Sequence, residues 1–146
     1  MQILTDLHYI DTSYLVPYYL PEANSEMVEK KLLKLPAGSI MISPLVRAEF
    51  ASLLSRKYRT KEMTEADARR VMTTLDRHLN IGALRLTSID SCDFKKATEW
   101  IMTMKHSLRA PDALHLAVAA RHDAVFWTLD KALARAARWA GLKTRK

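Results

Sequence analysis

Short apolar runs alternate along the chain with longer stretches in which apolar residues recur every three or four positions. The short runs predict strands at 7–11, 39–42, 83–86, 124–128 and 142–144. The periodic stretches predict helices at 28–35, 44–56, 64–79, 94–104, 112–120 and 131–139. Strands that alternate with helices indicate parallel strands joined by right-handed crossovers. We therefore predict an α/β fold, a three-layer α/β/α sandwich with a central, mainly parallel sheet of about five strands.

Glycine and capping residues mark the boundaries of these elements. Gly38, Gly82 and Gly141 each follow a helical pattern and precede a strand candidate, as expected for glycine just past a helix C-terminus. Ser43, followed by a proline, predicts the start of the helix that runs to about residue 56. The stretch 112–120 is apolar nearly all round, which predicts a central, buried helix.

Composition adds limits to this picture. The 146 residues suit one domain, spanning 1–146, that buries a core without disulfides or structural metal. Cys92 is the only cysteine, so no disulfide can form within the chain, and a reducing cytoplasmic setting is expected. No apolar run approaches the ~20 residues of a membrane span, and the N-terminus lacks the features of a signal peptide. We expect no membrane partner.

Four carboxylates stand where strand patterns pass into helix patterns, or about one turn beyond: Asp11, Glu49, Asp112 and Asp130. In a parallel sheet these junctions fall on one edge, where such folds bind ligands. Acids that converge there repel one another unless a positive charge lies between them. Oxygen-preferring cations such as Mg2+ or Mn2+ meet that need. The four acids are therefore predicted as metal ligands and catalytic residues for one or two ions.

Each acid also has a purely structural interpretation. Asp11 and Asp130 could cap the segments that follow them, and Asp112 would interact favourably with the dipole of its helix. Glu49 lies on or beside the apolar face of its helix, where an unpaired carboxylate is costly to bury. The placement of all four on one edge favours the metal site.

A metal held by carboxylates predicts hydrolysis of phosphodiesters, because the cation activates a water and stabilises charge on the phosphate. Thr12, Ser13 and Thr128 are predicted to supply hydroxyls that orient the carboxylates. Without metal, mutual repulsion predicts a raised pKa for at least one acid. His115, one turn beyond Asp112, is interpreted as a buried structural histidine.

Basic residues outnumber acidic ones by 23 to 16, which gives a net charge of +7. This charge suits a polyanionic partner, although a basic soluble protein without one has the same composition. Contacts with the backbone of a nucleic acid are predicted for Arg56, Lys57, Arg59, Lys61 and Arg109. Solvated surface is the alternative for these residues.

Four segments in order resemble the PIN domain, and specifically the VapC-type ribonuclease toxins of type II toxin–antitoxin systems. They are Ile10–Leu15, Ser43–Glu49, Leu108–Ala117 and Phe126–Asp130. The resemblance covers nearly the whole chain and implies a homodimer, Mg2+- or Mn2+-dependent cleavage of RNA, and inhibition by a cognate antitoxin protein. The family's acids transfer to Asp11, Glu49, Asp112 and Asp130. Leu133 and Ala134 depart from the family, in which an aromatic residue often follows the last motif.

We therefore predict a metal-dependent endoribonuclease that acts as the toxin of a toxin–antitoxin pair. One alternative is a catalytically silent PIN-like module that binds RNA or protein, but such a module has no need for four converging carboxylates. Another is a small-molecule phosphatase. The basic clusters and the lack of a glycine-rich phosphate loop make that alternative weaker.

Overall fold

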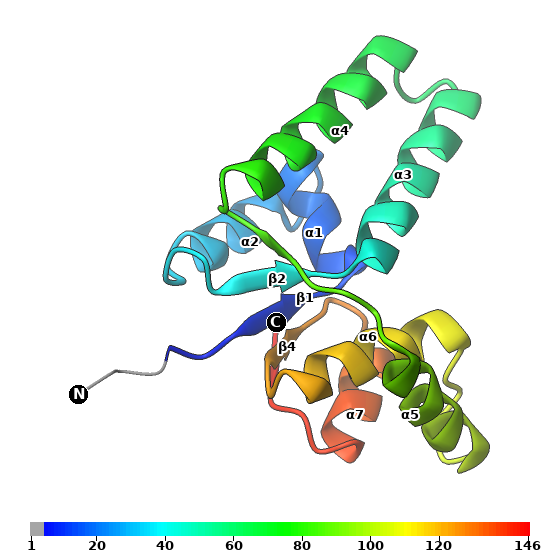
Figure 1. The fold of residues 1–146 in the computed structure, drawn as a ribbon. Helices are drawn as coiled ribbons and strands as arrows, with labels where there is room; N and C mark the ends of the chain where they lie inside the picture. The colour runs from blue at the N-terminus through cyan, green and yellow to red at the C-terminus, as the bar shows by residue number, and fades with distance from the viewer. Residues whose placement is uncertain (1–4) are drawn as a thin grey trace.

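The computed structural model describes residues 5–146. Its five strands are β1 (His8–Ile10), β2 (Ile40–Ile42), β3 (Arg85–Leu86), β4 (Val125–Trp127) and β5 (Thr144–Arg145). Its seven helices are α1 (Thr12–Tyr19), α2 (Ser25–Leu32), α3 (Pro44–Arg59), α4 (Glu65–Asn80), α5 (Ser91–Met102), α6 (Ala110–Arg121) and α7 (Lys131–Trp139) (Figure 1).

All the strands run parallel in the order β3-β2-β1-β4-β5. The first strand is therefore central, with His8 opposite Ile40 of β2 on one side and Val125 of β4 on the other. The connections from β1 to β3 run in one direction across the sheet, and those from β3 to β5 run back. With right-handed crossovers, this reversal places the later helices on the opposite face from the earlier ones.

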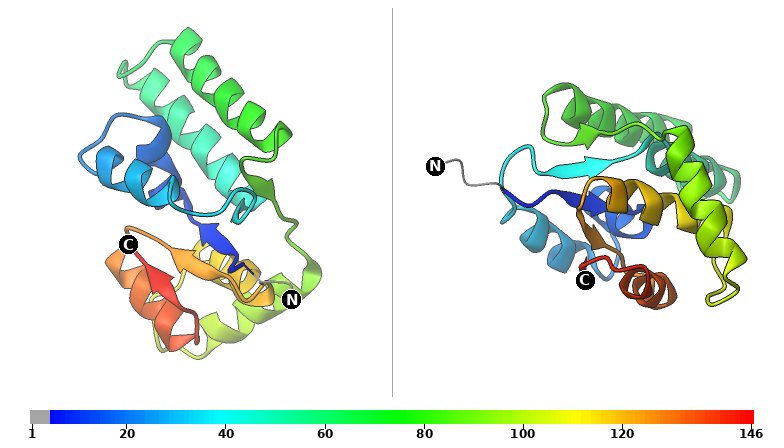
Figure 2. Two further views of the ribbon diagram at one scale, coloured as in Figure 1. Left: turned by 90° about the vertical axis from the view of Figure 1, so that its left-hand side faces the viewer. Right: turned by 60° about the horizontal axis from the view of Figure 1, so that its bottom comes forward.

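Successive side chains of β1 point to opposite faces of the sheet. Tyr9 packs against the ring of His115 on α6, whereas Ile10 lines an apolar hollow with Tyr18 and Leu33 beside α1 and α2. Both β1 residues are fully buried. Figure 2 shows the strands between these groups of helices. The predicted three-layer α/β/α sandwich around a parallel sheet is confirmed.

Helices α3 and α4 form an arm that extends away from the sheet (Figure 1). A bidentate ion pair near its base joins Arg47 of α3 to Asp76 of α4, with N–O distances of 2.8 and 2.9 Å. The tip of the arm is the turn between the helices, where Lys61 has a positive φ of 61°.

Several boundaries differ from prediction. Helix α1, which contains Pro17, was not predicted. Helix α2 ends at Leu32, so Gly38 belongs to a later turn and not to the helix cap. Helix α5 ends at Met102, and Met104 lies beyond it with a φ of 59°. Within residues 5–146, no helix combines the length and apolar character needed to cross a membrane.

Candidate active site

The four predicted acids lie at the carboxyl edge of the sheet, on four different elements. Asp11 follows β1 and caps α1, and Asp130 follows the neighbouring β4 and caps α7. Glu49 lies in the second turn of α3, which leaves the end of β2. Asp112 is the third residue of α6. The parallel topology therefore gathers at one edge acids that are as many as 119 residues apart, counting from 11 to 130.

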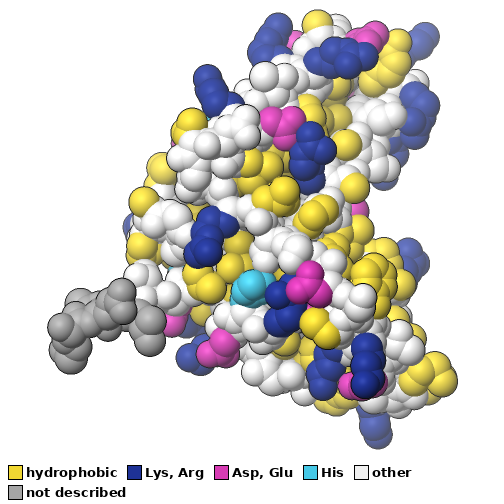
Figure 3. Space-filling view, in the orientation of Figure 1, with side chains coloured by type: hydrophobic (Ala, Val, Ile, Leu, Met, Phe, Trp, Pro, Cys, Tyr) yellow, Lys and Arg dark blue, Asp and Glu magenta, His cyan; other side chains and the backbone are white. Residues whose placement is uncertain are grey.

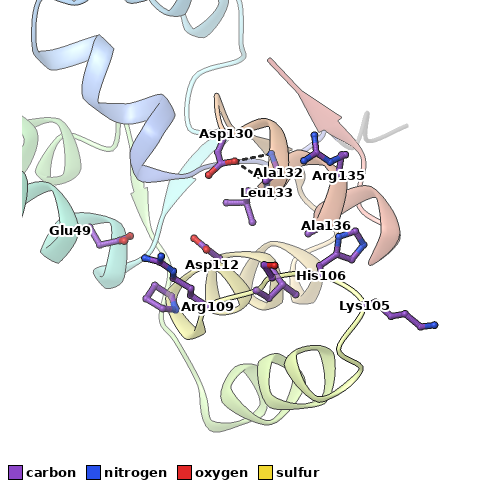
Figure 4. Close-up of a pocket in the computed structure, with 13 residues that line it drawn as sticks. Glu49, Lys105, His106, Arg109, Asp112, Asp130, Ala132, Leu133, Arg135 and Ala136 are labelled. Carbon is purple, nitrogen blue, oxygen red and sulfur yellow. Dashed lines mark hydrogen bonds between the residues drawn. The ribbon is translucent and has the colours of Figure 1, made fainter.

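A cleft of about 740 Å³ opens at this edge and is lined by Glu49, Asp112 and Asp130. Figure 4 shows the three carboxylates reaching it from separate elements. Its wall also carries Lys105, His106, Arg109 and Arg135. The cleft thus holds both acidic and basic side chains, which suits a site for a metal ion and an anion.

Asp11 lies behind the cleft, with only 3% of its surface exposed. Its Oδ1 accepts hydrogen bonds from the Ser13 hydroxyl (2.7 Å) and the backbone N–H of Tyr14 (3.0 Å). Its Oδ2 accepts from the Thr128 hydroxyl at 2.6 Å. Burial raises the pKa of Asp11 above its ordinary value, although the hydrogen bonds from Thr128 and Ser13 lower it in part.

The hydroxyls around Asp11 also fix the turn that carries Asp130. Ser13 accepts a hydrogen bond from the backbone N–H of Leu129, and Thr128 accepts one from that of Asp130, both at 3.0 Å. The Asp130 Oδ1 accepts from the backbone N–H groups of Ala132 and Leu133 in the first turn of α7. Asp11 is therefore linked to the turn of Asp130 through the hydroxyls of Ser13 and Thr128.

Glu49 is half-buried, and its Oε1 accepts two hydrogen bonds. The Thr12 hydroxyl donates at 2.8 Å, and Nε2 of His115 lies at 2.5 Å. Burial alone would raise the pKa of Glu49, but the hydrogen bonds from His115 and from the Thr12 hydroxyl hold it below its ordinary value. Glu49 therefore faces the cleft as a carboxylate.

Asp112 is half-buried in the first turn of α6 and has a raised pKa. Burial is the largest cause, and the charges of Asp130 and Glu49 raise it further, against an opposing effect of His115. The predicted repulsion between acids is therefore present, but desolvation exceeds it. A bound cation would reverse both effects.

No lysine or arginine among residues 5–146 forms an ion pair with any of the four acids. The oxygens in the cleft suit a hard divalent cation, which coordinates carboxylates and retains several waters. In the described part of the chain, one group of three potential ligands lies within 4.8 Å, but it is Asp90, Cys92 and Asp93 at the start of α5. The cleft acids are spaced more widely than that.

Comparison with known proteins identifies the fold. A family model described as the PIN domain matches residues 8–138, which is most of the chain. This chain belongs to the PIN-domain family. A search of curated proteins finds no match.

Solved structures with the same fold as this PIN domain include a toxin–antitoxin complex from Klebsiella pneumoniae, with a TM-score of 0.62 at 17% identity, covering 87% of this chain and 90% of its own. FitAcB from Neisseria gonorrhoeae has a TM-score of 0.70 at 17% identity, covering 96% of this chain and 97% of its own. Mycobacterium tuberculosis VapC20, described as a sarcin-ricin loop cleaving toxin, has a TM-score of 0.71 at 17% identity, covering 88% and 93%. VapBC2 from Rickettsia felis, bound to a promoter DNA fragment, has a TM-score of 0.66 at 16% identity, covering 95% and 97%.

The predicted basic residues of this PIN domain divide into two groups. Arg56 and Arg59 line a groove of about 430 Å³ together with Glu49, and Arg109 lines the acidic cleft. Lys57 pairs with Glu62, and Lys61 lies at the tip of the arm. Figure 3 shows lysine and arginine side chains spread over one face, including the arm. Only the first group therefore borders the acids.

Sequence reasoning did not single out several cleft residues of the PIN domain. Arg135 lines both the cleft and an adjoining hollow of about 430 Å³, which also contains Arg138 and Arg145. Lys105 lies in the loop before α6. His115 was assigned a structural role, yet it contacts Glu49 directly. The helical spacing of 112, 115 and 116 showed which residues share a turn, but not that this turn meets α3.

Proposed function

We propose that this PIN domain is a divalent-metal-dependent endoribonuclease that acts as the toxin of a toxin–antitoxin pair. Glu49, Asp112 and Asp130 line one cleft without a lysine or arginine partner in the described part of the chain, which supports a cation site. The raised pKa of Asp112 adds to this support, because a cation would stabilise its charged form.

Each acid would have a distinct role. Glu49 on α3 and Asp112 on α6 would hold the cation between them. Asp130 would contact it directly or through water. When bound, an Mg2+ or Mn2+ ion supplies positive charge at the phosphate and lowers the pKa of a coordinated water. Asp11 would keep the Asp130 turn in place through Ser13 and Thr128.

RNA is the substrate that best suits the surroundings of the acids. Arg56 and Arg59 line a groove that shares Glu49 with the cleft, and Arg135 lines the hollow on the far side of Asp130. A polyanionic strand laid across the acids would therefore meet guanidinium groups on both sides. Arg109, in the cleft itself, could contact the phosphate next to the cleaved bond. Lys57 and Lys61 do not lie along the acids, and their contact with a longer RNA remains a prediction.

The toxin role and the protein partners rest on the structural neighbours. The Klebsiella pneumoniae structure is described as a toxin–antitoxin complex and VapC20 as a cleaving toxin, whereas FitAB and VapBC2 are described as bound to DNA fragments. By analogy with these neighbours, we propose that a cognate antitoxin inhibits cleavage by this chain. We also propose that the chain forms a homodimer. Large exposed apolar side chains on and after α5, namely Phe94, Met102 and Met104, offer surface for such contacts.

Cleavage of purified tRNA, rRNA and mRNA tests the activity directly. We expect products with Mg2+ or Mn2+, none with EDTA, and at least a hundredfold loss of rate in Asp112→Asn, since removing a metal ligand removes a main source of transition-state stabilisation. Asp123→Asn is a matched control: Asp123 is exposed, lies outside the cleft, and has a φ of 50° that asparagine tolerates.

The control variant should cleave as the wild-type protein does. Products that persist in EDTA or in a folded Asp112→Asn variant would contradict the metal mechanism. A folded, antitoxin-free protein that cleaves none of these RNAs would favour the alternative of a silent binding module.

A further inference from the structure

A line of buried polar groups runs beneath the acids and ends on Glu49. Ser43, Tyr9 and His115 are all buried, with exposed fractions of 0, 0 and 3%. The Ser43 and Tyr9 hydroxyls are 2.8 Å apart, and the Tyr9 hydroxyl is 2.7 Å from Nδ1 of His115. Nε2 of His115 then lies 2.5 Å from Oε1 of Glu49. These groups come from three elements, β1, α3 with its cap, and α6.

For a neutral His115 ring, the donor and acceptor inventory gives this line one direction. A carboxylate only accepts, so Nε2 of His115 must carry the proton that it donates to Glu49. In the neutral ring Nδ1 then accepts, and the Tyr9 hydroxyl donates to it. Tyr9 in turn accepts from Ser43, whose oxygen accepts from the backbone N–H of Val46. Every group is satisfied when His115 is the Nε2–H tautomer.

The line leaves Glu49 with one free oxygen. Both His115 and Thr12 donate to Oε1, and Oε2 has no hydrogen-bond partner within residues 5–146. Because Glu49 lines the cleft, the oxygen left over is available to a cation there. Two donors on one oxygen also restrict the rotation of the carboxylate, which lowers the entropy lost on metal binding.

Stability alone is a weak reason for this arrangement. Buried hydroxyl and imidazole groups cost free energy to desolvate, and their hydrogen bonds at best offset that cost. Apolar side chains of similar size would fill the same space beside Phe126, on which Tyr9 stacks. The polar line therefore suits a role in placing Glu49.

We propose that His115, held in its Nε2–H tautomer by Tyr9 and Ser43, is a positioning residue that orients Glu49 toward the metal. This inference rests on the proposed metal-dependent activity and adds a residue to it. His115 touches neither the cation nor RNA in this role, since it acts through the Glu49 carboxylate. Its effect is therefore on metal affinity and on the rate of the chemical step.

The test measures Mn2+ affinity by calorimetry alongside RNA cleavage, in His115→Leu and Tyr9→Phe. Orienting residues of this kind typically change metal affinity or activity by about 10–100-fold. We expect a loss in that range for His115→Leu and about tenfold for Tyr9→Phe, with kcat reduced and the KM for RNA unchanged. Nitrogen-15 NMR of His115 should show the Nε2–H tautomer in the wild type and a mixture in Tyr9→Phe.

Tyr19→Phe provides the matched control. Tyr19 also donates to or accepts from a histidine, His78, at 2.6 Å, but this pair lies beside α1 and α4, away from the acids. The control should lose a part-buried Tyr–His hydrogen bond without changing Mn2+ affinity, kcat or the His115 tautomer. Tyr9→Phe removes a single oxygen atom, so it remains informative if His115→Leu fails to fold.

The outcomes separate this inference from the proposed function. A wild-type protein that neither binds Mn2+ nor cleaves RNA would overturn both. A wild-type protein that binds Mn2+, with Tyr9→Phe and any folded His115→Leu binding equally well, would overturn only the role of His115. Equal losses in Tyr9→Phe and Tyr19→Phe would reduce His115 to a structural residue and would also overturn the inference.

Discussion

Asp93 and Asp112 occupy the same position on two packed helices, yet their surroundings differ. Each is the third residue of its helix, α5 or α6. Asp93 accepts from the backbone N–H of Asp90 at 2.8 Å and from two nitrogens of Arg121 at 2.9 Å. These contacts, against the opposing effect of burial, hold its pKa below the ordinary value. Asp112 has no lysine or arginine partner in the described chain, and its pKa is raised.

The difference teaches that proximity alone does not identify a metal site. The group with Asp93 is the tighter one, since its potential ligand atoms lie within 4.8 Å of one another. Arg121 forms ion pairs with both of its carboxylates, and Asp93 also accepts a hydrogen bond from the backbone N–H of Asp90. The cleft acids are farther apart, but they leave charge and lone pairs unused. An acid cluster is a candidate cation site when the protein itself has not balanced it.

The largest effect that separates the two aspartates is on stability. Asp93→Asn should lower the free energy of unfolding by about 2 kcal/mol, because it weakens the charge-assisted hydrogen bonds between the buried Asp93 and Arg121. Asp112→Asn should change it by less than about 1 kcal/mol, the size of a helix-dipole contribution. Urea unfolding in EDTA, followed by circular dichroism, measures both. Equal destabilisation by the two variants would make Asp112 a structural residue.

In stabilisation by Mg2+, the two substitutions should rank the other way, with the larger effect for Asp112→Asn. At ten times its dissociation constant, Mg2+ should stabilise the wild-type protein by about 1.4 kcal/mol. Asp93→Asn should keep this gain, whereas Asp112→Asn should lose most of it. Thermal unfolding with and without Mg2+, each against EDTA, provides the measurement. A gain that disappears in Asp93→Asn and persists in Asp112→Asn would move the cation site to the start of α5.

Apart from α1, the sequence predicted the order of strands and helices, because apolar periodicity is a local property. The four acids also reached one edge, since parallel strands place all their carboxyl ends together. What the sequence did not show are contacts between distant segments. The Thr128 hydroxyl meets Asp11 across 117 positions, and His115 meets Glu49 across 66. No local pattern encodes which faces of α3 and α6 meet, so the contact of Thr128 with Asp11 and the link of His115 to Glu49 required the fold.

The ion pair of Asp93 also makes its contribution to stability depend on pH. The folded pKa of Asp93 lies below its unfolded value, so its contribution to stability is complete above the unfolded pKa and is lost as the pH falls through the folded one. The stability difference between the wild type and Asp93→Asn should therefore be constant near pH 7 and shrink below about pH 4.

Urea unfolding in EDTA at pH 7, 5, 4 and 3 measures this difference, with Arg121→Met as a matched variant that removes the other partner of the pair. Both variants should approach the wild-type stability as Asp93 becomes protonated. A difference that stays constant down to pH 3 would show that Asp93 stabilises α5 through packing and not through charge. Asp93 would then no longer serve as the example of a charge-paired acid against which Asp112 is compared.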